Sequence, residues 1–411
     1  MPTPPPVYWI IPFGAMLLAI ATLPLTAPHW WEPNRNKLIL SVLLGAPVLA
    51  LYLVRQPGAL TGMAGEYVSF IILVAGLYAI SGGLLLRGDL EATPATNTVF
   101  LALGATLASL IGTTGASMLL IRPLLQTNRE RRRVKHTVVF FIFLVSNIGG
   151  LLTPLGDPPL FLGYLQGVPF TWTFRLWGPW LTMVGTLLVT YFIWDSTQHA
   201  RESITARRRD REQIEPLRVR GAGNVVLLAG VVLAVALLHA PVREVVIVAL
   251  AGLSLWRMPR SIRRANGFTA APMVEVAVLF FGIFLTMIPA LELLRLRGHE
   301  LGVREPWQFF WASGLLSSFL DNAPTYLTFL ALGQGLRLTN EIVGVPHAIL
   351  AAVSIGSVAM GANSYIGNAP NFMVKAIAEA SGIRMPGFFA YMAYSGGVLI
   401  PLFVALTYLF F

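Results

Sequence analysis

The chain contains no cysteine among its 411 residues, and only 12% of its residues are charged. The absence of cysteine excludes disulfides, thiolate chemistry and cysteine-based metal sites. Soluble globular chains carry roughly 25% charged residues, whereas here 55% are hydrophobic and the mean hydropathy is +0.69. The longest polar stretch, residues 196–223, is too short to be a soluble domain. The composition therefore predicts an integral membrane protein.

Motifs of enzymes and of cofactor sites are also missing. The sequence contains no catalytic triad, phosphate-binding loop or HExxH motif, and its six histidines lack metal-ligand spacing. We therefore expect neither enzyme activity nor a bound cofactor. Two basic runs, 129–135 and 201–220, hold 12 of the 29 Lys and Arg residues. Such runs can bind nucleic acid, but beside apolar spans they are far more often topology signals, so the expected partner is a lipid bilayer and not a nucleic acid.

Ten apolar segments are long enough to span a bilayer, which takes about 17–25 residues. Two further apolar stretches, 97–125 and 306–332, are interrupted by the polar sequences GTTGAS and SSFLDNAPT. Each half of these stretches has about 11–15 residues, too few to cross at ~1.5 Å per residue. We predict that both are re-entrant hairpins whose polar tips reach the membrane midplane. The ten spans are expected at 7–26, 37–54, 67–86, 136–166, 175–195, 222–239, 241–256, 273–294, 346–380 and 387–411.

The distribution of Lys and Arg agrees with two hairpins. In this arrangement the loops on one side, counted together with the adjoining span ends, hold 20 Lys and Arg residues, and those on the other side hold 7. An excess of Lys and Arg marks the cytoplasmic side, so both termini are predicted to face outward. If either hairpin crossed fully, every later loop would change sides and the two richest loops would disagree with the rest.

Two of the predicted spans are broken helices. Residues 146–160, reading SNIGGLLTPLGDPPL, cannot form a lipid-exposed helix, because Gly and Pro interrupt the backbone hydrogen-bond ladder. Residues 361–371, reading GANSYIGNAPN, have the same character. Each break follows three spans and a hairpin, so the sequence predicts an all-α membrane protein with two inverted-topology repeats. The repeats are expected at 1–195 (hairpin 97–125, broken helix 136–166) and 222–411 (hairpin 306–332, broken helix 346–380), joined by a basic cytoplasmic connector at 196–221.

Polar side chains at the two tips and the two breaks are expected to converge near the midplane. Hydroxyl, amide and unwound backbone oxygens suit an alkali cation, whereas the N-termini of half-helices suit an anion. The candidate sodium ligands are Asp157, Asp321, Asn147 and Asn363. The full set of candidate ion- or substrate-binding residues is Thr113, Thr114, Ser117, Asn147, Thr153, Asp157, Ser317, Ser318, Asp321, Asn322, Thr325, Asn363, Ser364, Asn368 and Asn371.

Asp157 and Asp321 are the two acids expected at this depth. A carboxylate inside the membrane is costly and is a functional-site hypothesis by default. It can take a proton or a sodium ion but holds both poorly at once, which is the chemistry of exchange. The alternative is that each acid caps a half-helix, because DPP and DNAP are also turn sequences. Lys375 also has two interpretations. It is either a counter-ion for an aspartate or a side chain that snorkels to the interface. Asp195 is expected to be interfacial.

The broken and hairpin segments resemble the ArsB/NhaD-type branch of the ion transporter superfamily. The GG…TP…GDPP pattern is matched by Gly149, Gly150, Thr153 and residues 156–159, although Leu160 stands where Asn is usual. LDNAP at 320–324 resembles the hairpin motif of the family, and GANSYIGNAPN resembles its second break. The resemblance covers essentially the whole chain. It implies a multi-pass protein of the bacterial inner (cytoplasmic) membrane, often a homodimer, that moves a transport domain against a scaffold.

Members of this superfamily include sodium/proton antiporters, arsenite permeases and carboxylate transporters. The hairpin tips lack the Ser-Asn-Thr triplet of divalent-anion sodium symporters, which favours the antiporter or citrate-type branches. The leading hypothesis is a Na⁺(Li⁺)/H⁺ antiporter in which Asp157 and Asp321 bind the cation and exchange it for protons. The alternative is a cation-coupled symporter of citrate-like carboxylates or another small anion. A third hypothesis is a channel-like or scaffold protein whose hairpins are structural.

Overall fold

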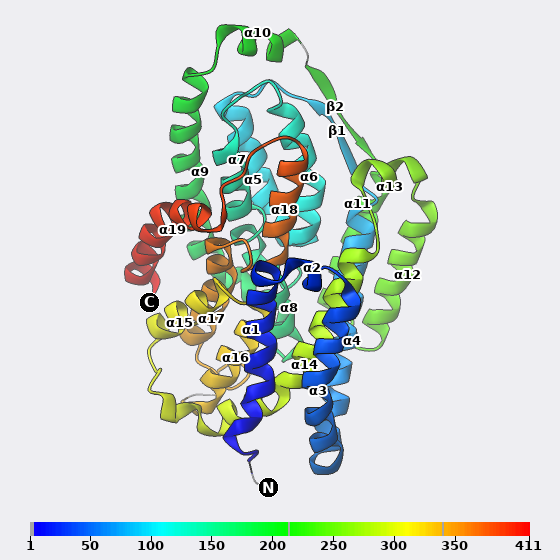
Figure 1. Ribbon diagram of the computed structural model, residues 1–411, viewed down its shortest axis with the longest axis vertical. Coiled ribbons are helices and arrows are strands. Elements are labelled where there is room, and N and C mark those ends of the chain that lie inside the picture. The colour runs from blue at the N-terminus through cyan, green and yellow to red at the C-terminus, as the bar shows by residue number, and fades with distance from the viewer. Residues whose placement is uncertain (1–3, 213, 339–340) are drawn as a thin grey trace.

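The computed structural model describes residues 4–212, 214–338 and 341–411, and these are almost entirely helical (Figure 1). Within these residues, eight helices are long and apolar enough to cross a membrane, or nine if the bent pair α12 (Val242–Arg257) and α13 (Arg260–Asn266) counts as one span. The prediction of an all-α, multi-pass membrane protein is therefore confirmed.

The number of span-length helices differs from the expected ten because some of the predicted segments form helices shorter than a span. Seven of the ten predicted spans reach span length, and an eighth is the bent pair α12–α13. The other two, α11 (Gly223–Leu237) and the segment His347–Asn363, are shorter apolar helices. Conversely α5 (Pro94–Ile111), expected to be a short hairpin arm, extends to 18 residues because it begins at Pro94 after the N-cap Thr93.

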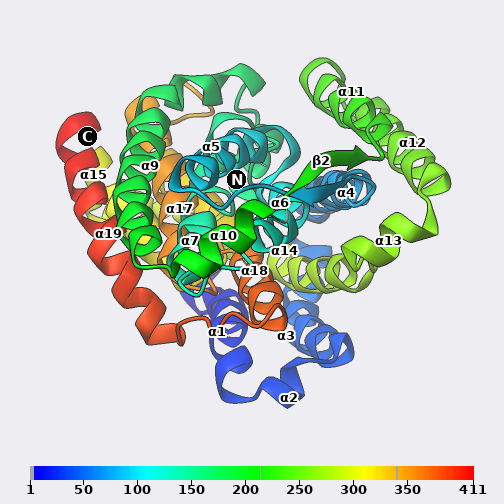
Figure 2. The same cartoon turned by 90° about the horizontal axis from the view of Figure 1, so that it is seen from above.

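Six helices form one group, which we call the scaffold group (Figure 2). Its central helix is α14 (Ala271–Arg297), whose Phe280 ring stacks on that of Phe70 with the centroids 4.6 Å apart. Lys37 forms a 2.7 Å ion pair with Glu275 on the same helix. The other members are α1 (Ile11–Thr26), α3 (Asn34–Arg55), α4 (Pro57–Ser81), α11 and α12, with the short helices η1 (Val7–Ile10) and α2 (Pro28–Trp31) at the chain start.

Apart from α10 and α13, the remaining helices form a second bundle, which we call the core group. Its innermost helix is α7 (Lys135–Leu144), in which every residue from 136 to 144 is buried, as expected for a helix that is apolar all round. The outer members are α9 (Trp177–Ala200), preceded by η3 (Phe170–Leu176), and α19 (Phe388–Phe410). A short 3-10 helix, η4 (Gly298–Leu301), connects the scaffold group to α15 (Pro306–Ser317) of the core group.

Both predicted hairpins are pairs of helices within the core group. Helices α5 and α6 (Thr113–Thr127) meet at Gly112, whose φ of +83° favours glycine. At the other end of the pair the side-chain amides of Asn97 and Asn128 exchange two 2.9 Å hydrogen bonds, so α6 returns to where α5 began. Helices α15 (Pro306–Ser317) and α16 (Asn322–Gly335) fold back in the same way and bring the rings of Phe309 and Phe329 to 6.3 Å.

Both predicted breaks are present. Between α7 and α8 (Pro158–Leu165) the chain forms η2 (Ile148–Leu152) and then an extended turn. Between α17 (His347–Ala359) and α18 (Ala369–Ala380) it forms η5 (Met360–Asn363) and a similar turn. A Cβ on Gly156 would lie 2.0 Å from the carbonyl oxygen of Gly150, and a Cβ on Gly367 would lie 2.5 Å from that of Gly361. Glycine at these positions is therefore required by the close approach of two backbone segments.

Two short strands lie outside the helical groups, and the sequence does not predict them. Strand β1 (Leu85–Asp89) pairs antiparallel with β2 (Glu215–Arg220), which follows α10 (Ile204–Glu212). We call this sheet the strap. Strand β1 belongs to the connection from α4 to α5, and β2 belongs to the connection from α9 to α11, so the strap ties together two links between the scaffold group and the core group (Figure 1).

Candidate ion- and substrate-binding site

The carboxylate of Asp157 is the centre of the buried polar site. Thr113 Oγ1 donates to Asp157 Oδ1 at 2.7 Å, and Asn322 Nδ2 donates to Asp157 Oδ2 at 2.5 Å. Asn368 Nδ2 also donates to Oδ1, at 3.1 Å. The three donors come from the tip of the first hairpin, the tip of the second hairpin and the second break. The structure thus gathers four predicted site residues, far apart in sequence, around one carboxylate.

Local sequence explains why this carboxylate is available. Asp157 is the N-cap residue of α8, and two prolines follow it in the first turn of the helix. Proline lacks a backbone N–H, and the Asp157 side chain makes no capping hydrogen bond to α8. The carboxylate therefore faces the hairpin tips, and the capping interpretation does not describe Asp157.

Asp321 differs from Asp157 in this respect. It is the N-cap residue of α16, and its Oδ1 accepts a 3.0 Å hydrogen bond from the backbone N–H of Ala323. Thr325 Oγ1 donates to the backbone carbonyl of Asp321, at 2.9 Å. Asp321 is only partly buried, whereas Asp157 is 1% exposed. Asp321 therefore has the geometry of a helix cap. The ion-binding role predicted for it stays a prediction.

A second set of polar contacts links the two breaks. Asn147 Nδ2 donates to Asn371 Oδ1 at 2.7 Å and to the carbonyl of Ile142 at 2.8 Å. Asn371 Nδ2 in turn donates to the carbonyls of Gly361 and Ser364, both at 2.9 Å. The unwound backbone of the second break is therefore held by an asparagine pair that spans the two halves of the chain.

Three buried amide oxygens have no hydrogen-bond donor among the described residues. They are the Oδ1 atoms of Asn147, Asn322 and Asn363. The amide nitrogens of the same three side chains are all used, on Asn371, Asp157 and Ser318. Leaving a buried polar atom without a partner costs free energy, and amide oxygens are hard ligands suited to an alkali cation. These three oxygens are thus free to accept a further contact and are of the chemical type that binds an alkali cation.

Several other predicted residues satisfy broken backbone or each other. Thr153 Oγ1 donates to the carbonyl of Ser109, and Ser364 Oγ donates at 2.5 Å to the carbonyl of Ser318. Ser317 Oγ donates to the carbonyl of Ser357 at 2.6 Å, and the hydroxyls of Ser117 and Ser146 lie 2.8 Å apart. These side chains hold the hairpins against the breaks, which is the usual role of hydroxyls at helix ends.

Two serines outside the predicted set belong to this framework. Ser109 Oγ donates to the carbonyl of Gly149 at 2.5 Å, and Ser146 contributes its carbonyl to Asn368 Nδ2 at 3.0 Å. Ser109 lies inside the apolar helix α5, and Ser146 lies at the start of the first break. A small polar residue beside apolar sequence is the signal that identifies both. Ser318 is one of the predicted site residues, and its Oγ donates to the carbonyl of Met360 at 3.1 Å. This contact in the second half is equivalent to the contact that Ser109 makes in the first half.

Four helices begin at this site. They are α6, α8, α16 and α18, and among them only α16 has a side-chain cap. The N-terminus of a helix carries a partial positive charge and free N–H groups, which favour an anion. Within the described residues neither Asp157 nor Asp321 forms a salt bridge with a basic side chain. Positive potential at the site therefore comes from backbone dipoles.

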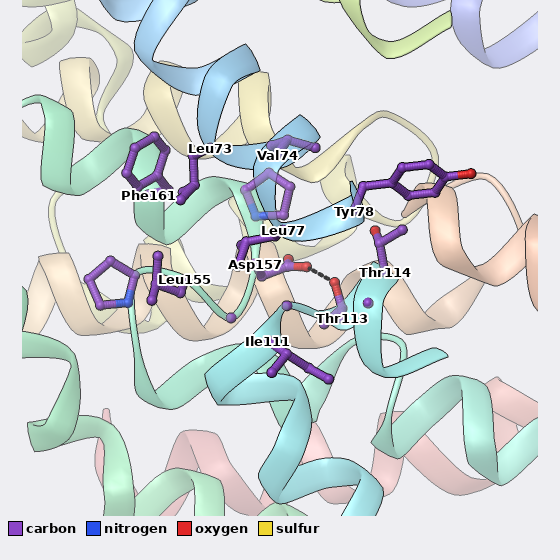
Figure 3. Close-up of a pocket in the computed structure, with 15 residues that line it drawn as sticks. Leu73, Val74, Leu77, Tyr78, Ile111, Thr113, Thr114, Leu155, Asp157 and Phe161 are labelled. Atoms are coloured by element: carbon purple, nitrogen blue, oxygen red, sulfur yellow. Dashed lines mark hydrogen bonds between the residues drawn. The ribbon is translucent and has the colours of Figure 1, made fainter. Parts of the chain in front are cut away.

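A cavity of about 40 Å³ adjoins Asp157 (Figure 3). Its walls come from α4 (Leu73, Leu77 and Tyr78), from the first hairpin tip including Thr114, and from the break before α8. This volume holds water or a small ion, whereas pockets for larger organic ligands have roughly 300–1,000 Å³. The cavity lies where the scaffold group meets the core group, so relative movement of the two groups would change its size.

Lys375 and Asp195 have partners away from Asp157. Lys375 Nζ pairs with Glu379 at 3.1 Å and lies over the ring of Tyr365, so its charge is balanced on its own helix. Asp195, expected at the interface, is fully buried. Its carboxylate accepts two hydrogen bonds from Arg131, at 2.5 and 3.0 Å, and lies 2.7 Å from His136 Nε2. The expectation failed for Asp195 because the loop 128–134 folds over the end of α9 and covers it.

Comparison with known families gives a match that covers nearly the entire chain. The family model described as "Putative citrate transport" matches residues 3–411. No curated protein matches the chain. The matched range includes both hairpins, both breaks and the strap, so the match concerns the whole architecture and not an isolated motif.

Proposed function

The chain belongs to the family described as "Putative citrate transport", and from this premise we propose that it is a cation-coupled secondary transporter of citrate-like carboxylates. The observation that carries the proposal is the buried Asp157 carboxylate, which lies among helix N-termini suited to a carboxylate substrate. A negatively charged substrate and an ionised Asp157 repel each other in this low-dielectric interior. Binding of the substrate therefore requires that Asp157 first take up a sodium ion or a proton.

This requirement is the basis of coupling. With Asp157 neutralised, the positive ends of the helix dipoles of α6, α8 and α18 can bind a carboxylate, and with Asp157 ionised they cannot. The amide oxygens of Asn147, Asn322 and Asn363 supply further ligands for a sodium ion. Asp321 would remain a cap of α16.

Uptake of labelled citrate into proteoliposomes tests the proposal. We expect accumulation when a sodium or proton gradient is imposed, and at least a tenfold lower rate in Asp157→Asn. Citrate uptake that is independent of both gradients would contradict coupling. Absence of citrate, malate and succinate uptake under all gradients would contradict the carboxylate substrate.

Among the described residues, no basic side chain pairs with Asp157 or Asp321. This favours a second candidate function. An acidic site without an anion clamp suits exchange of Na⁺ or Li⁺ for H⁺, with the same carboxylate binding either ion in turn. For this antiporter we expect purified protein in liposomes to dissipate a pH gradient when Na⁺ is added, with no carboxylate present. A pH gradient that responds only when citrate is also present would assign the protein to the first candidate.

The membrane arrangement follows from the same proposal. We place the protein in the bacterial inner membrane with both termini outside, the strap and the basic loops in the cytoplasm, and two inverted repeats whose core group moves against the scaffold group. A homodimer is expected. Cysteine labelling at exposed loop positions tests the orientation, and the natural chain contributes no thiol background.

A further inference from the structure

Helix α12 ends at a sharp corner that carries arginines. The chain turns by 102° between α12 and α13, so α13 runs across the end of α12 instead of continuing it (Figure 2). Ile262 on α13 is buried in a small cluster with Leu85 of the strap. Asn266 Nδ2 donates to the carbonyls of Gly82 and Leu84, at 2.8 and 2.7 Å. Helix α13 is thereby fixed to the strap and to the end of α4.

The face of the strap next to α13 is basic. Cross-strand partners in a sheet share a face, and so do alternate residues along a strand. In the strap Leu85 is opposite Arg220, and Arg87 is opposite Arg218. Since Leu85 packs against α13, these three arginines lie on the side of the strap that faces α13. Like charges placed opposite each other destabilise a sheet, so this arrangement calls for a counter-ion.

Helix α13 and the end of α12 add four more arginines, at positions 257, 260, 263 and 264. We call the seven together the basic platform; its members are Arg87, Arg218, Arg220, Arg257, Arg260, Arg263 and Arg264. Within the described part of the chain none of them has a carboxylate within salt-bridge distance, and the buried Nε of Arg263 has no acceptor. Six of the seven are exposed. Within the described residues the platform is therefore a concentration of positive charge without ion-pair partners.

The position of the basic platform beside a membrane helix indicates the chemical class of its counter-ion. Trp256, immediately before the corner, is 80% exposed, and tryptophan is enriched where a helix leaves the hydrocarbon. Exposed valines at 245 and 248 continue the apolar surface down α12. An acyl chain can lie along these valines while its headgroup reaches the arginines. Clusters of Lys and Arg directly next to a membrane helix are suited to anionic lipid headgroups.

We propose that the basic platform is a binding site for the headgroup of an anionic phospholipid. A lipid bound there would contact α13 and both strands of the strap, and so would fix the two connections between the scaffold group and the core group. The proposal does not depend on which substrate is transported.

Thermal unfolding in detergent with added lipid tests the site. The probe is phosphatidylglycerol, compared with phosphatidylcholine and with inorganic phosphate. We expect phosphatidylglycerol to raise the unfolding temperature of the wild type, and the other two additives to leave it unchanged. The triple variant Arg257→Gln, Arg260→Gln, Arg264→Gln should lose at least half of this increase, while the corresponding Lys variants should keep most of it.

A matched control removes the same charge elsewhere. Arg201, Arg208 and Arg209 are exposed residues of the connector, and their replacement by Gln should leave the effect of phosphatidylglycerol unchanged. Equal stabilisation of the wild type by both lipids would overturn the proposal, as would full stabilisation of the platform variant. An equal loss in the control would show a general charge effect and would also overturn it. If the triple Gln variant does not fold, native mass spectrometry of the single variants Arg257→Gln and Arg264→Gln decides the question. Less retained phosphatidylglycerol than in the wild type supports the site, and retention equal to that of the wild type overturns it.

Discussion

Asn368 donates a 3.1 Å hydrogen bond to Asp157, and the two residues occupy the same place in the two breaks. Asp157 follows Gly156, and Asn368 follows Gly367. The two glycines are therefore as far apart in the sequence as the two residues that follow them. Each is the N-cap residue of the helix that resumes after the break. The two broken helices thus meet at a pair of equivalent side chains of which only one is an acid. The second break therefore has an amide at the position where the first break has a carboxylate.

This relationship predicts that the acid can be moved to the other half. Asp157→Asn should lower coupled transport at least tenfold, because a hydrogen bond or ligand contact to a charged group contributes about 1.5–3 kcal/mol. The double variant Asp157→Asn, Asn368→Asp keeps one carboxylate and one amide in contact, and we expect it to recover part of the activity. Transport rates in proteoliposomes measure both.

Asp321→Asn is the control for that experiment. Asn caps helices about as well as Asp, so a residue that only caps α16 should tolerate the change with less than about a threefold loss of transport, which corresponds to ~0.6 kcal/mol. A loss as large as that of Asp157→Asn would instead assign Asp321 to the ion site. Full activity of Asp157→Asn would contradict the central role of Asp157.

Thr113 and Thr114 form a matched pair for the same site. Thr113 Oγ1 donates to Asp157, whereas Thr114 lines the cavity and makes no hydrogen bond to the carboxylate. We expect Thr113→Val to weaken the apparent affinity for the coupling cation about tenfold or more, since the lost bond involves a charged acceptor. Thr114→Val should change it less than threefold. Sodium titrations of transport measure the two affinities, and equal effects would show that Thr113 is not a specific partner of Asp157.

Much of the site could be predicted because it depends on residues that are anomalous in a membrane helix. Gly, Pro, Asn and Asp stand out against apolar sequence, so the breaks at 146–160 and 361–371 and the two hairpin tips are visible without a structure. The different roles of Asp157 and Asp321 are not visible in this way. Both precede a helix, and only the position of Thr113 and Asn322 relative to Asp157 shows which carboxylate faces its neighbours.

The strap and the buried Asp195 could not be predicted for a related reason. Strand β2 has six residues and is exposed along its whole length, so the short alternation from Leu217 to Arg220 gives no buried face that would identify a strand. Its partner β1 lies far earlier in the sequence. Asp195 lies at the end of a span, where acids are usually solvated, and its burial depends on a loop that brings Arg131 over it. Contacts between distant segments decide both features.

The close approach at the first break predicts a large effect of a single methyl group. Gly156→Ala places a Cβ 2.0 Å from the Gly150 carbonyl, so backbone must move, and we expect destabilisation of about 3 kcal/mol or more. Gly185→Ala is the control, because a Cβ there meets nothing within 4 Å and alanine favours the helix α9. Thermal unfolding in detergent compares the two. Equal unfolding temperatures would contradict the geometry of the break.

The buried pair of Arg131 and Asp195 predicts strong coupling between two substitutions. Asp195→Asn leaves the Arg131 guanidinium buried with its main partner lost, which costs about 3–5 kcal/mol in comparable pairs. Arg131→Met combined with Asp195→Asn removes both charges, and we expect it to be more stable than Asp195→Asn alone. A double-mutant cycle of unfolding free energies measures the coupling, and additive effects of the two substitutions would contradict the pair.

The strap predicts a dependence of stability on pH. Burial and the nearby charge of Glu130 raise the pKa of Asp89 to about 6. A carboxyl group whose pKa is higher in the folded state binds more protons there, so its contribution makes the protein less stable as the pH rises from about 4 to about 6. Asp89→Asn removes this titration, and its stability relative to the wild type should increase over the same interval by about 1–3 kcal/mol. Unfolding temperatures between pH 4 and pH 8 measure the difference.

Glu212→Gln is the control, an exposed change of the same kind on α10, and it should show no such increase. A constant difference in stability between Asp89→Asn and the wild type would show that Asp89 does not titrate in the strap.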